Sequence, residues 1–162
     1  MKKNIKFLLN FFTIFALFLN LNLAYAAGGD GGGDNYSNLY KEAKRLVLRA
    51  KKLEKKNKIE KAKKLYLKGY GKLEKAYAKD KKNPDILNYL GFVLRKTGDF
   101  EKAEKFYLKG LSFDSGHLGI NEYLGELYVQ TNRIELAKER LQVLNGCKCE
   151  EYKELKELIE NN

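Results

Sequence analysis

The chain of 162 residues is poor in four residue types, with one His, two Cys, one Pro and no Trp. One His and two Cys cannot complete a four-ligand zinc site unless carboxylates or a second chain contribute ligands. A single Pro argues against a turn-rich β-sandwich. The sequence also lacks the motifs of serine hydrolases, zinc proteases and nucleotide-binding loops. We therefore expect a non-catalytic protein without a cofactor or a metal site.

The abundant residues indicate helices. Lys, Glu, Leu and Ala are frequent, and all four favour helical conformation. Apolar residues make up 44% of the chain and charged residues 33%, which excludes both a disordered chain and a polytopic membrane protein. The length fits one domain.

Residues 1–26 contain the three parts of a secretory signal peptide. Three Lys lie within residues 1–6, an uncharged and mainly apolar run follows at 7–23, and Ala-Tyr-Ala ends the segment at Ala26. An uncleaved membrane anchor is the alternative, but the run is short for a span and contains three Asn. We expect cleavage after Ala26 and a periplasmic or secreted protein.

Residues 27–36 are predicted to form a flexible linker. Five Gly lie between positions 28 and 33, and Gly loses the most backbone entropy when a chain becomes ordered. Asp30 and Asp34 suggest a calcium loop as an alternative, but their spacing does not match an EF-hand.

A period of 34 residues runs through the rest of the chain. Residues 88–91 (NYLG) align with residues 122–125 (EYLG), an offset of 122 − 88 = 34. The same offset pairs Ala103 with Ala137, and an earlier copy at 56–69 matches 97–110 at an offset of 97 − 56 = 41. The seven additional residues are about two helical turns, so the insertion preserves the buried face.

This pattern resembles the tetratricopeptide repeat family, whose unit is a helix-turn-helix of 34 residues with Leu-Gly early and Ala-x3-aromatic late. The resemblance implies an all-α solenoid of about three repeats, at 37–80, 84–117 and 118–145, with a Cys-x-Cys loop and a capping helix at 146–162. Periodicity predicts helices at 37–56, 58–80, 84–96, 100–113, 118–130, 133–145 and 150–160.

The resemblance also implies that the first helix of each pair lines a concave groove whose outward residues contact a ligand. By the alignment these partner-binding residues are Asn88, Phe92, Arg95, Lys96, Glu122, Glu126, Val129 and Gln130. Phe92 is the expected apolar anchor, although ordinary packing between repeats is the alternative. The clamp that some members use for a peptide carboxylate is not matched, because Glu122 and Glu126 replace its Lys and Asn.

Positive charge is concentrated in the first predicted repeat. From Lys41 to Lys82 there are 18 Lys and Arg against 5 Asp and Glu, whereas residues 117–162 hold 6 basic and 9 acidic residues. The basic segment has three interpretations, namely a solvated helix surface, an anionic membrane surface, or an acidic partner protein. Nucleic acid is not expected as a partner, because export would separate the chain from it.

Cys147 and Cys149 are candidates for a disulfide, because paired cysteines are usual in exported proteins. Free thiols, an intermolecular bridge, and capture of copper or zinc are the alternatives. His117 precedes a predicted helix, and a capping or surface role is favoured over catalysis.

The sequence therefore predicts an exported, non-catalytic scaffold or adaptor of the cell envelope that binds a protein or peptide in its concave groove. Two alternatives remain, namely a thiol-active or metal-capturing protein that uses Cys147 and Cys149, and a protein that associates with membranes through residues 41–82. The partner and the oligomeric state stay open.

Overall fold

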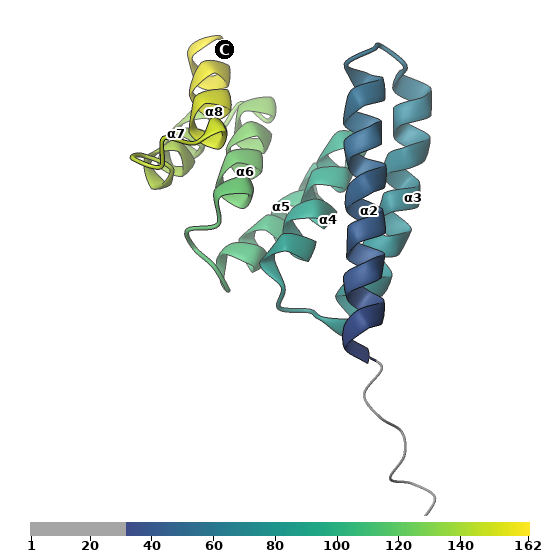
Figure 1. Cartoon of the computed structure of the whole chain (residues 1–162). Coiled ribbons are helices and arrows are strands. Elements are labelled where there is room, and N and C mark those ends of the chain that lie inside the picture. Colours follow the sequence, from purple (N-terminus) through teal and green to yellow (C-terminus); the bar gives the residue numbers. More distant parts are fainter. Residues whose placement is uncertain (1–31) are drawn as a thin grey trace, which may run out of the picture. The chain divides into compact units, whose positions relative to one another are not determined.

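The computed structural model describes residues 32–162, and the predicted signal peptide at 1–26 lies outside the described residues. Within this range seven α-helices follow one another and no β-strand occurs. The helices form the pairs α2 with α3, α4 with α5 and α6 with α7, and α8 packs against α6 and α7 (Figure 1). This arrangement confirms the predicted all-α solenoid with a capping helix.

The first hairpin consists of α2 (Gly32–Glu54) and α3 (Ile59–Lys79). Its buried residues are spaced three and four apart, which places them on one face of each helix. They are Ala43, Val47 and Ala50 on α2, and Ala62, Tyr66, Gly69, Leu73 and Ala76 on α3. The turn between the helices places Asn57 in the left-handed region, with φ of 54°. Asn tolerates this conformation better than most residues do.

The start of α2 corrects the predicted linker. We expected a flexible segment to residue 36 and a helix from residue 37, but α2 begins at Gly32. Tyr36 and Leu39 pack against the hydrophobic core of the first hairpin. Apolar packing at these positions therefore extends the helix toward the glycine-rich segment, against its low helix propensity.

The second hairpin consists of α4 (Pro84–Thr97) and α5 (Phe100–Leu111). Pro84 is the first helical residue, where its missing N–H costs nothing, and the Asn83 side chain accepts a hydrogen bond from the backbone N–H of Ile86 at 3.3 Å. Gly98 ends α4 with φ of 96°, a conformation that favours glycine. Asp99 then caps α5 by accepting a hydrogen bond from the backbone of Lys102 at 3.2 Å.

The third hairpin consists of α6 (Leu118–Gln130) and α7 (Ile134–Val143), and α8 (Glu150–Glu160) follows it. His117 caps α6, because its Nδ1 accepts a hydrogen bond from the backbone N–H of Ile120 at 3.2 Å. The capping role predicted for His117 is thus confirmed. The described helix α7 is shorter than the predicted range 133–145, whereas α6 and α8 match their predicted ranges.

Two glycines allow the hairpins to close tightly. A Cβ atom at Gly91 of α4 would lie 2.5 Å from the Tyr107 ring of α5. A Cβ atom at Gly125, the equivalent position of α6, would lie 2.5 Å from Leu155 of α8. The capping helix therefore supplies the large side chain that covers the last small residue of the stack, which closes the open end of the solenoid.

Aromatic residues join successive hairpins. Tyr89 of α4 packs edge-on against Tyr40 of α2, with ring centroids 5.7 Å apart. Tyr123 of α6 packs against Phe92 of α4, with ring centroids 4.8 Å apart. The two tyrosines that the 34-residue period aligns thus make equivalent contacts with the preceding hairpin. None of the helices within 32–162 has the length and apolar character that crossing a membrane requires.

Candidate functional site

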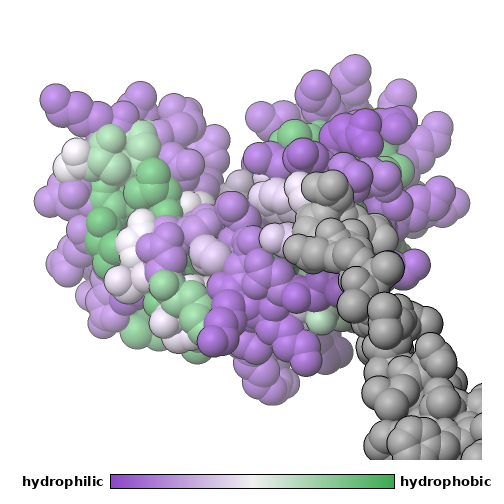
Figure 2. Space-filling model, turned by 60° about the horizontal axis from the view of Figure 1, so that its bottom comes forward, coloured by the Kyte–Doolittle hydropathy of each residue, from purple (hydrophilic) through white to green (hydrophobic). Residues whose placement is uncertain are grey.

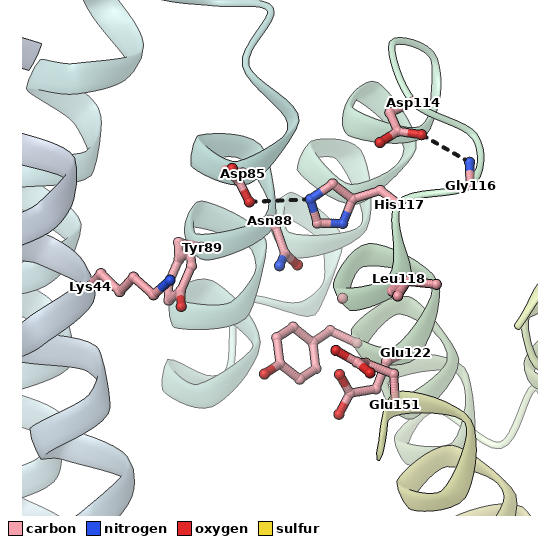
Figure 3. Close-up of a pocket in the computed structure, with 12 residues that line it drawn as sticks. Lys44, Asp85, Asn88, Tyr89, Asp114, Gly116, His117, Leu118, Glu122 and Glu151 are labelled. Carbon is pink, nitrogen blue, oxygen red and sulfur yellow. Dashed lines mark hydrogen bonds and ion pairs between the residues drawn. The ribbon is translucent and has the colours of Figure 1, made fainter. Parts of the chain in front are cut away.

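A cleft of about 450 Å³ lies where α2, α4, α6 and the start of α8 meet (Figure 3). The first helix of every hairpin contributes to it, which is the concave side that the repeat pattern predicts. Its lining is largely polar and contains four carboxyl groups. The lining residues are Lys44, Asp85, Asn88, Tyr89, Asp114, Gly116, His117, Leu118, Gly119, Glu122, Tyr123 and Glu151.

The rim of the cleft is tied by two local interactions. His117 Nε2 lies 3.4 Å from Asp85 Oδ1, which connects α6 to the start of α4. Asp114 accepts a hydrogen bond from the backbone N–H of Gly116 at 3.1 Å, which fixes the loop between α5 and α6. Figure 3 shows both contacts at the same edge of the cleft. Asp85 and Asp114 therefore already have partners within the protein. The acceptors without such partners lie deeper in the cleft.

Asn88 is the most unusual polar residue of the cleft. Its side chain is 6% exposed, and its Oδ1 has no hydrogen-bond partner among residues 32–162. A Cβ atom at position 119 would lie 2.8 Å from Asn88 Nδ2, so Gly119 leaves the space that the amide occupies. A buried acceptor without a donor is uncommon in folded proteins and requires an explanation.

Glu122 lies at the floor of the cleft and is 4% exposed. Burial raises the pKa of Glu122 to about 9, and a hydrogen bond with Glu154 and the negative charges of Glu126 and Glu154 act in the same direction. Lys51 of α2 lowers the pKa, but by less. Glu122 is therefore protonated at neutral pH in the unliganded protein.

Glu122, Glu126 and Glu154 form a carboxyl cluster that joins α6 to α8, with one oxygen of each within 4.8 Å of the others. Arg95 of α4 limits its negative charge, because its Nη1 lies 2.7 Å from Glu126 Oε2. This contact brings the two charges together without the alignment of a hydrogen bond, and Arg95 Nε and Nη1 have no hydrogen-bond partner within the described part of the chain. The Arg95 side chain is 1% exposed, so this ion pair is a buried one.

Cations and aromatic rings alternate along the groove. The guanidinium of Arg95 lies 5.6 Å from the ring centroids of both Phe92 and Tyr123. Lys51 Nζ lies 5.4 Å and 5.6 Å from the same two rings, and Lys44 Nζ lies 5.9 Å from the Tyr89 ring. These distances are within the range of cation–π attraction. The concave side is thus lined by faces that attract positive charge.

The predicted partner-binding residues divide into two groups. Asn88 and Glu122 line the cleft, whereas Arg95 and Glu126 form an ion pair with each other and do not line it. The other four do not line the cleft either. Lys96 forms an ion pair with Glu54 of α2 at 2.6 Å, Gln130 is exposed at the end of α6, and Phe92 and Val129 are buried in the hydrophobic core.

Phe92 therefore does not have the anchoring role that we expected. It is 3% exposed, and Tyr66 and Tyr123 cover its ring. The alternative interpretation, packing between repeats, describes its position. Adjacent hairpins pack so closely that α3 and α6 enclose Phe92, although it lies on the side of α4 that faces the groove.

Sequence reasoning placed α2 along the groove but named none of its residues, and it missed the contribution of α8. Lys44 and Lys51 come from α2, and Glu151 and Glu154 come from α8, which we had interpreted only as a cap. The acidic first turn of α8 was the available signal, since Glu150 and Glu151 stand where a helix N-terminus is positive.

The two cysteines lie away from the cleft, in the loop between α7 and α8. The structure joins Cys147 and Cys149 in a disulfide, with Cα atoms 5.1 Å apart. Figure 2 shows one face of the molecule. Hydrophilic side chains cover most of this face, and hydrophobic side chains gather on the side of α6 to α8.

Comparisons with known proteins agree with this architecture. Residues 72–105 match the family model of the tetratricopeptide repeat. The repeat domain of Arabidopsis OM64 is 13% identical and aligns over 76% of this chain and 98% of its own, with a TM-score of 0.51. A tetratricopeptide repeat protein from Parabacteroides merdae is 15% identical over 74% of this chain and 59% of its own, with a TM-score of 0.53.

The Sgt2 repeat domain from Aspergillus fumigatus is 18% identical over 74% of this chain and 78% of its own, with a TM-score of 0.50. At these identities the likeness concerns the fold alone. No curated protein matched the sequence.

Proposed function

Because the chain is a tetratricopeptide repeat protein, we propose that it is a non-catalytic scaffold that binds a protein or peptide segment along its concave side. The observation that carries this proposal is the cleft of about 450 Å³ between α2, α4, α6 and α8. Its walls come from three hairpins and the capping helix, so only the assembled stack forms it. Solenoids typically use such a concave surface to hold extended partners.

The site suits recognition better than chemistry. It offers carboxyl, amide, ammonium and aromatic groups on rigid helices, and none of the residues that line it is a Ser, Thr or Cys. An extended segment can contact both oppositely charged walls, since α2 contributes lysines and α6 and α8 contribute glutamates. A polar rim around such contacts gives specificity and speeds association.

We also propose that the protein works in the cell envelope after export. The predicted signal peptide at 1–26 and the cysteine pair support this location. The mass of the intact protein isolated from its native cells tests it. We expect a chain that begins at Ala27 and that takes up alkylating reagent only after reduction. A full-length mass would contradict export by cleavage, and alkylation without reduction would contradict the disulfide.

A crosslinking capture experiment with two leucine variants tests the groove. Leu118 lines the cleft and is 40% exposed, whereas Leu108 of α5 lies outside the cleft and is 48% exposed. Leu118→Trp should fill the cleft and abolish capture of the partner, while Leu108→Trp should retain it. Equal capture by both variants would contradict binding in the cleft. Both residues are exposed, so neither change disturbs the core.

Binding of anionic membranes by the first hairpin is a second candidate function. The specific observation is the row of exposed lysines near the tip of this hairpin, including Lys55, Lys56, Lys58 and Lys61. Vesicles with and without anionic phospholipid provide the test. Binding should require the anionic lipid and disappear in high salt, because salt screens exposed charges. Equal binding to neutral vesicles would contradict this function.

A further inference from the structure

The unpaired acceptor of Asn88 is the first indication of the ligand's chemistry. Figure 3 shows the Asn88 amide directed from α4 into the space between Tyr89 and Leu118. Its Oδ1 has no donor within residues 32–162 although the side chain is 6% exposed. A folded protein normally satisfies such an atom. A hydrogen-bond donor that arrives with a ligand would satisfy it here.

Two carboxyl groups line the cleft together with Asn88. Glu122 of α6 and Glu151 of α8 line the cleft with Asn88, and Figure 3 shows them side by side. No cationic side chain of the described residues forms an ion pair with either of them. In contrast, Glu126 is already paired with Arg95, and Asp85 is in contact with His117. Glu122, Glu151 and Asn88 are therefore three acceptors available to one guest.

Aromatic faces complete the site. Tyr89 and Tyr123 line the cleft, and Lys44 and Lys51 of this chain already lie within 6 Å of their ring centroids. These contacts show that the rings receive ammonium groups in this environment. Carboxylates with aromatic faces are the combination that binds organic cations in proteins. An anionic guest would instead meet the negative wall, and an apolar guest would leave the acceptors unsatisfied.

We propose that this cleft receives a basic side chain, a lysine ammonium or an arginine guanidinium, from the bound partner. Glu122 and Glu151 accept its hydrogen bonds, Asn88 accepts another, and Tyr89 and Tyr123 flank its methylene stem. The proposal rests on the proposed function, because it specifies what the partner inserts into the groove. The local balance of charge supports it, since residues 117–162 hold 9 acidic and 6 basic residues although the whole chain is basic.

Titration with two short blocked peptides, trilysine and triglutamate, tests the proposal on the full chain. We expect trilysine to shift the NMR signals of the Asn88 side-chain amide and of Gly119, and triglutamate to leave them unchanged. Glu122→Gln and Glu151→Gln should each weaken trilysine binding about tenfold, since Gln cannot become a carboxylate beside the bound cation. Glu135→Gln is the matched control, because Glu135 lies on α7 with its side chain 83% exposed and does not line the cleft.

Three results would overturn the proposal. One is that triglutamate shifts the same signals as strongly as trilysine. Another is that both cleft variants bind trilysine as the wild type does. The third is that magnesium or calcium chloride alone saturates the same signals and excludes trilysine, which would make the cleft a metal site. Because Gln is uncharged and close to Glu in size, loss of the fold is not expected in these variants.

The same reagents separate this proposal from the broader one. If the partner is captured through the groove but trilysine does not compete with it, only the basic side chain is wrong. If Leu118→Trp captures the partner as well as Leu108→Trp does, binding in the groove is wrong whatever trilysine does.

Discussion

Replacing Glu122 by Gln should stabilise the fold at neutral pH, although the change removes a carboxyl group from the candidate site. Burial and then the neighbouring carboxyl groups raise the pKa of Glu122 from 4.5 to about 9. The groups that face it are Lys51 on α2, Glu126 on α6, and Glu151 and Glu154 on α8. Burial, Glu154 and Glu126 oppose its ionisation, and the single lysine does not compensate for them.

The magnitude follows from proton linkage. The folded protein holds the proton more tightly than the unfolded chain, so the contribution of Glu122 is fully present below pH 4.5 and is lost as pH rises toward 9. Each pH unit between 4.5 and 7 costs about 1.4 kcal/mol, which amounts to about 3 kcal/mol at pH 7. Glu122→Gln avoids this cost, because a carboxamide stays neutral and still donates a hydrogen bond to Glu154.

Urea unfolding followed by circular dichroism measures the effect. At about pH 5 the wild type and Glu122→Gln should have similar free energies of unfolding, and the difference should grow as pH rises. With an m-value of about 1.5 kcal/mol/M, the midpoint at pH 7 should move up by about 2 M urea. A difference that stays constant between about pH 5 and pH 8.5 would refute the raised pKa. A variant less stable than the wild type at pH 7 would refute it as well.

Three further substitutions test the packing of the stack. Gly91→Ala should lower the free energy of unfolding by about 1–3 kcal/mol, because its Cβ would lie 2.5 Å from Tyr107. Gly71→Ala should instead raise it by about 0.5–1 kcal/mol, because no atom lies within 4 Å of its Cβ and Ala favours helix; thermal unfolding of both variants checks the sign. Glu126→Gln should cost about 3 kcal/mol in urea unfolding by leaving buried Arg95 unpaired, and a loss below about 1 kcal/mol would contradict a buried ion pair.

Helix ends were predictable wherever the chain carries an explicit signal. Pro84 and Gly98 delimit α4, and the structure places its ends within a residue of the prediction. The capping site at His117 likewise fixed the start of α6. The start of α2 was missed because composition alone indicated a linker, whereas Tyr36 packs against a hydrophobic core that the local sequence does not reveal.

The sequence predicted which side of the hairpins carries the candidate site, but not how deeply each of its residues is buried. The 34-residue period placed Asn88 and Glu122 on the same side of successive hairpins, and both line the cleft. It could not show that Phe92 is enclosed, because burial depends on how closely neighbouring hairpins curve together. It also could not show that α8 directs Glu151 toward the cleft. The capping helix is not part of the 34-residue repeat, so the alignment gives no equivalent position for its residues.

The first hairpin reaches farther than the others. At about 1.5 Å per residue, the 23 residues of α2 span about 34 Å, whereas the 14 residues of α4 span about 21 Å. Residues 55–61, at the tip of this hairpin, are all exposed. Backbone amides there should exchange with deuterium sooner than those beside Leu73, and trypsin should cut there first. A fluorophore or affinity handle inserted at 55–58 would therefore leave the cleft free for its guest.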